Sequence, residues 1–135
     1  MVADGRFVYA IDYGDDNLIR ISESTGVVDE VPLPVTSDVE QGYGLALSGG
    51  KLYFTLSDDT QPSFGAASTL GYVDVGDWEV GSAACPGASD CDPTPPLGVV
   101  YKLPSFAQSD LRGISVDADG SIALADLHQI VRVSP

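Results

Sequence analysis

The sequence predicts an all-β fold, and three observations support this prediction. Apolar side chains recur at every second position in short segments, which is the spacing of strands rather than of helices. Gly, Asp and Asn separate these segments where hairpin turns are expected. The segment 113–134, GISVDADGSIALADLHQIVRVS, contains three such strands and two turns, and its pieces recur twice more in the 135 residues. The chain is therefore predicted to consist of repeated antiparallel units.

The first unit covers residues 1–41. Its turn at 3–5, ADG, matches 118–120, so this unit is expected to lack its first strand. The segment 17–22, NLIRIS, matches 129–134, QIVRVS, position for position, so Arg20 is equivalent to Arg132. Strands are expected at 6–12, 17–22 and 27–34. The last of them contains prolines that suit an outer edge, because proline donates no hydrogen bond to a neighbouring strand.

The second unit covers residues 42–109 and carries two long insertions. Strands are expected at 44–47, 51–58, 70–75 and 98–104. The insertions at 59–69 and 76–97 separate the last three of these strands. Insertions into a repeat usually extend one rim of the fold, where ligands or partners are met.

The third unit covers residues 110–135. Ile122 and Leu124 fall on one face of its second strand, and Ala123 and Ala125 fall on the other. Both faces of this strand are therefore expected to be covered. Three strands account for the unit, so it is expected to be incomplete, like the first.

Antiparallel four-stranded units of about 40 to 50 residues are typical of β-propeller blades. The sequence therefore predicts one domain, 1–135, that is a β-propeller fragment of about three blades with incomplete first and last blades. Closed propellers have about four to eight blades. Unfinished blades leave open sheet edges, so we expect either self-association or a chain that is part of a longer protein.

The charge of the chain excludes some classes of partner. Six basic residues stand against twenty acidic ones, which gives a net charge of −14. Such a chain repels phosphate backbones, so nucleic acid is not an expected partner. No apolar run of eighteen residues is present, so membrane insertion is not expected. The first residues also lack the basic and apolar regions of a signal peptide.

The two cysteines, Cys85 and Cys91, lie in the short segment CPGASDC within the second insertion. A disulfide between them would close a small loop and pin the insertion, and we favour this interpretation. It predicts an extracellular or periplasmic location. A zinc site is the alternative, with the two cysteines and the single histidine as its soft ligands.

Three aspartates end equivalent strands of the three units: Asp12, Asp58 and Asp126. Equivalent positions of a propeller lie on one rim, where three carboxylates could hold Ca²⁺ or another divalent cation. The alternative, which we favour, is that each carboxylate accepts hydrogen bonds from the amides of its own turn.

Two further residues are candidates for ligand binding. Trp78, in the second insertion, could stack on a sugar, and the alternative is a packing role beneath the long loop. His128, the only histidine, could act as a general base. The alternative for His128 is an exposed residue in a turn.

Three segments of the chain resemble known propeller families. The phrases NLIRISESTGVVDEVPLP and LRGISVDADGSIALADLHQIVRVSP resemble the repeats of virginiamycin B lyase-like and NHL propellers. The phrase GYGLALSGGKLYFTLSDD is similar to a segment of regucalcin and gluconolactonase-like propellers, whose Asn and final Asp help to hold a divalent metal over the central channel. Asp58 matches that Asp, and Tyr43 or Gly44 stands in place of the Asn.

From these observations we expect a propeller-type binding or scaffold module that contacts a protein or a glycan through the inserted loops of its middle blade. Tyr43, Trp78 and His128 are its candidate contact residues. The alternative is a metal-dependent hydrolase or lyase of the gluconolactonase or virginiamycin B lyase type. That enzyme would be complete only with further blades or by oligomerisation.

Overall fold

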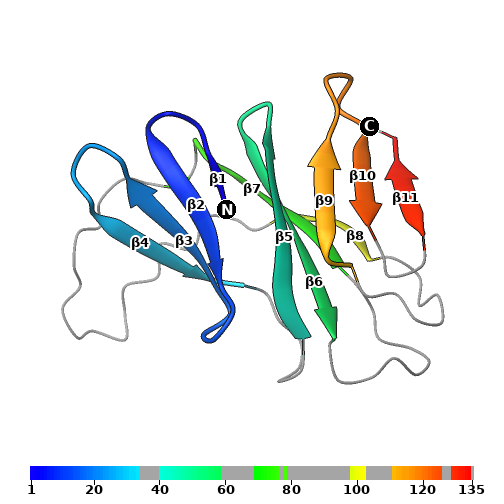
Figure 1. The fold of residues 1–135 in the computed structure, drawn as a ribbon, viewed down its shortest axis with the longest axis horizontal. Helices are drawn as coiled ribbons and strands as arrows, with labels where there is room; N and C mark the ends of the chain where they lie inside the picture. Colours follow the sequence, from blue (N-terminus) through cyan, green and yellow to red (C-terminus); the bar gives the residue numbers. More distant parts are fainter. Residues whose placement is uncertain are drawn as a thin grey trace.

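The fold is seen in a computed structural model that describes residues 1–33, 40–58, 69–76, 78, 98–102, 111–125 and 129–134 (Figure 1). These residues contain eleven strands and no helix, which confirms the all-β prediction. No helix that could cross a membrane occurs among them. The strands are β1 (Val2–Ala3), β2 (Phe7–Asp12), β3 (Asn17–Ser22), β4 (Val28–Pro32), β5 (Glu40–Ser48), β6 (Lys51–Asp58), β7 (Thr69–Asp74), β8 (Gly98–Lys102), β9 (Gly113–Val116), β10 (Ile122–Ala125) and β11 (Ile130–Val133).

The strands form three antiparallel sheets in which each strand pairs with the next along the chain. The first sheet has the order β1-β2-β3-β4, the second β5-β6-β7-β8 and the third β9-β10-β11. Tight turns that contain glycines with positive φ close several hairpins, for example Gly49 and Gly50 between β5 and β6. Within the described residues the three sheets remain an open row and form no closed barrel.

The first sheet has one strand more than the sequence predicts. Val2 pairs with Tyr9 and Ala3 with Val8, so the residues assigned to the end of a turn include the short strand β1. This corrects the expectation that the first unit lacks its first strand. A strand of two residues is too short to show an alternating pattern, and only the pairing reveals it.

Strand β5 starts four residues before its predicted beginning at residue 44. It pairs with β6 from Glu40 onward, and a bulge interrupts the register between Gly42 and Leu45. The backbone at Gly42 lies close to the first sheet, because a Cβ there would be 2.6 Å from Leu33 Cδ1. Glycine is therefore needed for the approach of β5 to the first sheet.

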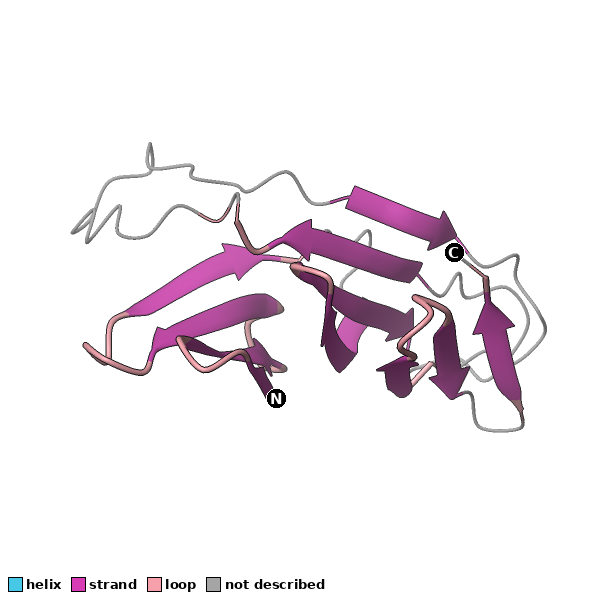
Figure 2. Ribbon diagram, turned by 90° about the horizontal axis from the view of Figure 1, so that it is seen from above, coloured by secondary structure: helices cyan, strands magenta, loops and turns pink. Residues whose placement is uncertain are grey.

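The sheets pack face to face in chain order, and the second sheet lies between the other two. Figure 2 shows this row from above, with the N-terminus at the first sheet and the C-terminus at the third. The contacts agree, because β5 touches β1 and β2 on one side and β9 on the other. The middle sheet is therefore covered on both faces.

Two apolar cores fill the spaces between the sheets. The core between the first and second sheets contains Tyr9, Leu18, Val31, Leu33, Leu52, Phe54, Leu56, Val73 and Trp78. The core between the second and third sheets contains Leu70, Leu111, Ile122 and Leu124. Leu18, Leu52 and Phe54 are fully buried, and burial of each such side chain contributes about 1.5–3 kcal/mol to folding. The alternation along each strand thus decides which core a side chain enters.

Candidate functional site

One rim of the molecule collects the ends of equivalent strands from all three sheets. Strands β2, β6 and β10 end at this rim, and β5 and β9 begin there, on the lower side of Figure 1. Four side chains from different parts of the chain meet at it: Tyr13 after β2, Gln41 and Tyr43 in β5, and Arg112 before β9. We call these four residues the rim cluster.

The rim cluster is held by ring contacts and one hydrogen bond. The rings of Tyr13 and Tyr43 meet edge to face, with centroids 5.8 Å apart and planes at 69°. The Arg112 Cζ lies 5.3 Å from the centroid of the Tyr43 ring. The Tyr43 hydroxyl donates a hydrogen bond to Gln41 Oε1 at 3.5 Å. Tyr43 therefore links the first sheet to the third.

The bulge in β5 places Tyr43 at the rim. Its backbone is anchored at Gly44, whose N–H donates to the buried Thr55 Oγ1 at 2.9 Å. The same hydroxyl donates to the Leu111 carbonyl oxygen at 3.3 Å, which ties the bulge to the segment that leads into β9. A Cβ at Gly44 would lie 2.9 Å from both Ile114 Cγ2 and Thr55 Oγ1, so the second and third sheets approach closely here.

Asp12 lies next to the rim cluster, in the turn after β2. Its Oδ1 accepts a hydrogen bond from the Gly14 N–H at 2.9 Å, which is the turn contact named above as an alternative to metal binding. Asp58 ends β6 with its backbone paired to Glu40, while its side chain and the whole of Asp126 lie outside the described residues. Among the residues that are described, no three His, Cys, Asp or Glu side chains form a group suited to a metal. The cation site of Asp12, Asp58 and Asp126 therefore stays a prediction.

Trp78 lies away from the rim cluster, buried between the first and second sheets. Its ring packs 6.1 Å from the Tyr9 ring, centroid to centroid, and the Arg20 Cζ lies 4.8 Å above it. The Arg20 Cζ also lies 4.7 Å from the centroid of the Phe7 ring. Arg20, with 1% of its side chain exposed, donates to Asp29 Oδ2 from Nη2 at 2.7 Å. Trp78 thus forms part of the core and covers the buried arginine of an ion pair.

A second carboxylate with a structural role is Asp4, in the turn before β2. It accepts hydrogen bonds from the Arg6 and Phe7 amides and from the Tyr9 hydroxyl, the last at 2.9 Å. Burial acts to raise the pKa of Asp4, but these hydrogen bonds outweigh it and the pKa is lowered. Burial, with the hydrogen bond to Asp4, raises the pKa of Tyr9 to about 12. The sequence marks Asp4 only as a turn residue, and its partner Tyr9 is not apparent from spacing.

The remaining candidates from the sequence, His128, Cys85 and Cys91, lie outside the described residues. Their proposed roles, and the location that a disulfide would imply, stay predictions. Three members of the rim cluster, Tyr13, Gln41 and Arg112, were not singled out from the sequence. Their positions in the repeat are the sequence feature that points to this rim. Tyr13 follows Asp12 at a strand end, and Arg112 directly precedes the repeated Gly113.

No model of a known protein family, no curated protein and no solved structure matches the chain. The geometry of the rim is therefore the basis for an assignment of function. Tyrosine rings and a guanidinium at a surface offer apolar faces together with hydrogen-bond donors, which suits recognition of another molecule.

Proposed function

We propose that the chain is part of a β-propeller and serves as a binding or scaffold module. Three consecutive antiparallel meanders that stack face to face support the propeller assignment. The repeat resemblance described above supports it independently. The partner is a protein or a glycan. Of the two insertions in the middle unit, the first begins after β6 at the rim of the cluster, whereas the second begins after β7, beside the start of β6 at the other end of the sheet.

The observation that carries the binding role is the convergence of Tyr13, Tyr43 and Arg112 at one rim from three different sheets. Tyr13 is half exposed and Arg112 is exposed. Tyrosine and arginine are enriched among the residues that dominate binding energy at protein interfaces, and tyrosine rings also stack on sugars. The insertion between β6 and β7 begins after Asp58, which ends β6 at this same rim, and its own residues lie outside the described part of the chain.

The proposal is tested by a search for ligands followed by variants of the rim. The purified chain is applied to a defined glycan array and is used to select from a random-peptide library. The affinity of each ligand obtained is then measured for Tyr13→Ala and Arg112→Ala, with Val27→Ala, an exposed turn variant of the first sheet, as the control. We expect a loss of at least about tenfold for the two rim variants and no change for the control. Equal affinities for all four proteins, or no ligand from either collection, would contradict the proposal.

A further inference from the structure

Two sheet faces lie at the ends of the row, and the one on the first sheet is half-buried while the one on the third sheet is exposed over most of its residues. We call the face of each sheet that points to the next sheet along the chain its leading face, and the opposite one its trailing face. The leading face of the third sheet carries Gly113, Ser115, Ala123, Ala125, Ile130 and Arg132, which the registers place in two rows. The trailing face of the first sheet carries Val8, Ala10, Ile19, Ile21, Val28 and Glu30.

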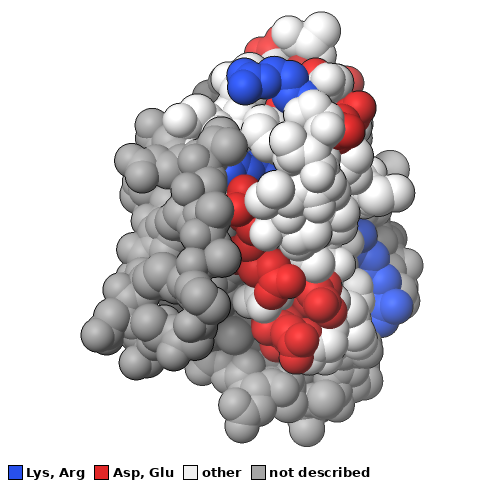
Figure 3. All heavy atoms as spheres, turned by 90° about the vertical axis from the view of Figure 1, so that its left-hand side faces the viewer, with Lys and Arg blue, Asp and Glu red and all other residues white. Residues whose placement is uncertain are grey.

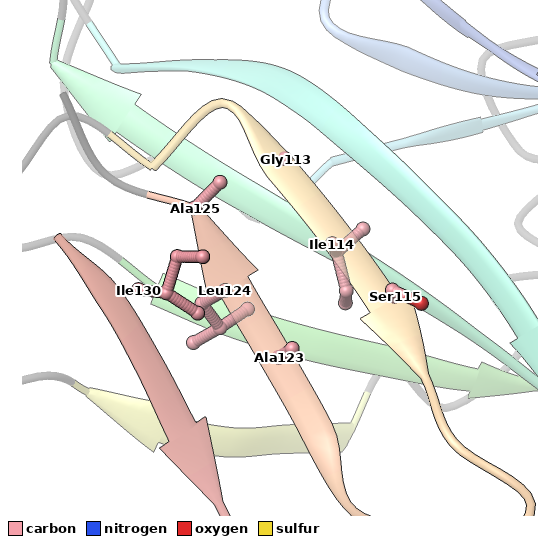
Figure 4. A pocket seen from close by; sticks show the side chains of 7 residues that line it. All are labelled: Gly113, Ile114, Ser115, Ala123, Leu124, Ala125 and Ile130. Carbon is pink, nitrogen blue, oxygen red and sulfur yellow. The ribbon is translucent and has the colours of Figure 1, made fainter.

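The leading face of the third sheet is apolar and exposed. Ile130 has 78% of its surface accessible, and the Arg132 side chain has 62%. A shallow hollow of about 310 Å³ lies over Ala123, Ala125 and Ile130 (Figure 4). Small side chains line its floor, so the face could accept larger apolar side chains from another surface.

The first sheet shows what covers such a face. In the match between 17–22 and 129–134, Leu18 is equivalent to Ile130 and Arg20 is equivalent to Arg132. The strand pairing agrees with this match. Arg20 pairs with Tyr9, and Arg132 pairs with Ala123, which is the residue equivalent to Tyr9. Leu18 and Arg20 are 0% and 1% exposed. Leu18 is buried in one core with Leu52, Phe54 and Leu56 of the trailing face of the second sheet. Arg20 is covered by the rings of Trp78 and Phe7.

The trailing face of the first sheet is the matching surface. In the other two sheets the trailing face is buried, as Phe54 and Leu124 show. In the first sheet the equivalent face is only partly covered, and 51% of Val28 is exposed at its edge. Both interfaces within the chain join a leading face to a trailing face.

We propose that the leading face of the third sheet binds the trailing face of the first sheet of a second copy of this chain, head to tail. This arrangement repeats the two interfaces that the chain already contains. Pairing of two first sheets is disfavoured, because Asp and Glu side chains follow this side of the molecule as a stripe (Figure 3) and would repel one another. The leading face of the third sheet carries the cation Arg132, which is ion-paired with Asp117 and Asp119 in the turn between β9 and β10. The inference does not rest on the binding role of the rim.

Head-to-tail contact is heterologous, so each copy uses two different surfaces. Such contacts close into a ring when the rotation between copies allows it and otherwise continue into longer assemblies. A copy whose leading face is blocked can therefore still bind through its trailing face, and the reverse also holds. This property separates the proposal from a symmetric dimer, in which one surface meets itself.

The test measures mass in solution by light scattering for the wild-type chain and three variants. Ile130→Glu places a charge on the leading face and Val28→Glu on the trailing face, while Val27→Glu makes the same kind of change in a turn outside both. All three positions are exposed, and circular dichroism checks that each variant folds. Wild type and Val27→Glu are expected above the 14.0 kDa of one chain, and each face variant alone at 14.0 kDa.

The decisive sample is an equimolar mixture of Ile130→Glu and Val28→Glu. Each retains the face that the other has lost, so the mixture is expected to form a species of two chains. A wild-type chain that stays at the mass of one copy at all concentrations would overturn the proposal. The proposal would also be overturned if only one of the two face variants lost the ability to associate. A mixture of the two variants that stays monomeric would overturn it as well.

Discussion

The Arg20 guanidinium donates a hydrogen bond from Nη1 to the Trp78 carbonyl oxygen at 2.6 Å, and its Cζ lies 4.8 Å from the centroid of the Trp78 ring. This contact joins the middle strand region of the first sheet to a residue of the second insertion. Asp29 balances the buried charge from the neighbouring strand. The hydrogen bond and the cation–π contact therefore tie the first sheet to the segment that follows β7, while the ion pair lies within the first sheet.

Replacement of Arg20 is expected to destabilise the chain strongly. Arg20→Ala leaves the partly exposed Asp29 without its cation and the Trp78 carbonyl without its donor, which costs about 1–3 kcal/mol of unfolding free energy. The matched control is Arg132→Ala, because Arg132 holds the equivalent position but is exposed, and its ion pairs to Asp117 and Asp119 are worth at most about 1 kcal/mol. Urea unfolding measures both, and equal losses would show that the burial of Arg20 is unimportant.

Stability is expected to fall at alkaline pH because of Tyr9. Its pKa is raised from 10.0 to about 12 in the folded chain, chiefly by burial. A raised folded-state pKa contributes stability that is fully present below pH 10 and is lost as the pH rises through 12. The contribution is on the order of 2 kcal/mol. Unfolding measured at pH 9 and pH 11 should show a smaller drop for Tyr9→Phe than for wild type, whereas identical drops would exclude Tyr9 as a source.

The bulge that presents Tyr43 is expected to depend on one hydroxyl. Thr55→Val keeps the shape of the side chain but leaves the Gly44 N–H without its acceptor and the Leu111 carbonyl without this donor, at a cost of about 1–3 kcal/mol. Thr55→Ser retains the hydroxyl and should recover most of that loss. If Thr55→Ser is as unstable as Thr55→Val, the methyl group and not the hydrogen bonds determines stability at this position.

Divalent cations separate the binding module from the alternative enzyme. A cation that binds the folded chain alone raises the melting temperature with its concentration. We expect millimolar calcium chloride to change the melting temperature no more than sodium chloride of equal ionic strength does. A larger increase that Asp12→Asn abolishes would instead support the metal site of Asp12, Asp58 and Asp126, and with it the hydrolase or lyase.

Much of the fold follows from local pattern. The strands β2, β3 and β6 lie within a residue of their predicted bounds, because long alternation and glycine turns specify them without tertiary information. Strand β1 is too short for this, and the start of β5 has no apolar alternation from Glu40 to Gly42. Those two strands depend on pairing with neighbours.

The candidate site was much harder to predict than the strands. Tyr13, Tyr43 and Arg112 are far apart in sequence, and only the packing of three sheets brings them together. Asp12 was predicted to end its strand, and it does so. The repeat also equates Arg20 with Arg132, yet their environments differ completely, because Trp78 covers the first and nothing within the described residues covers the second to the same extent.

We propose above that the rim cluster forms a contact surface for a partner. The most direct test of this proposal is the affinity of Tyr13→Ala for the ligand that the wild-type chain selects, measured by isothermal titration calorimetry. We expect an affinity at least about tenfold weaker, with only a small fall in melting temperature, because Tyr13 is half exposed and loses one ring contact with Tyr43. An affinity equal to that of wild type would contradict it.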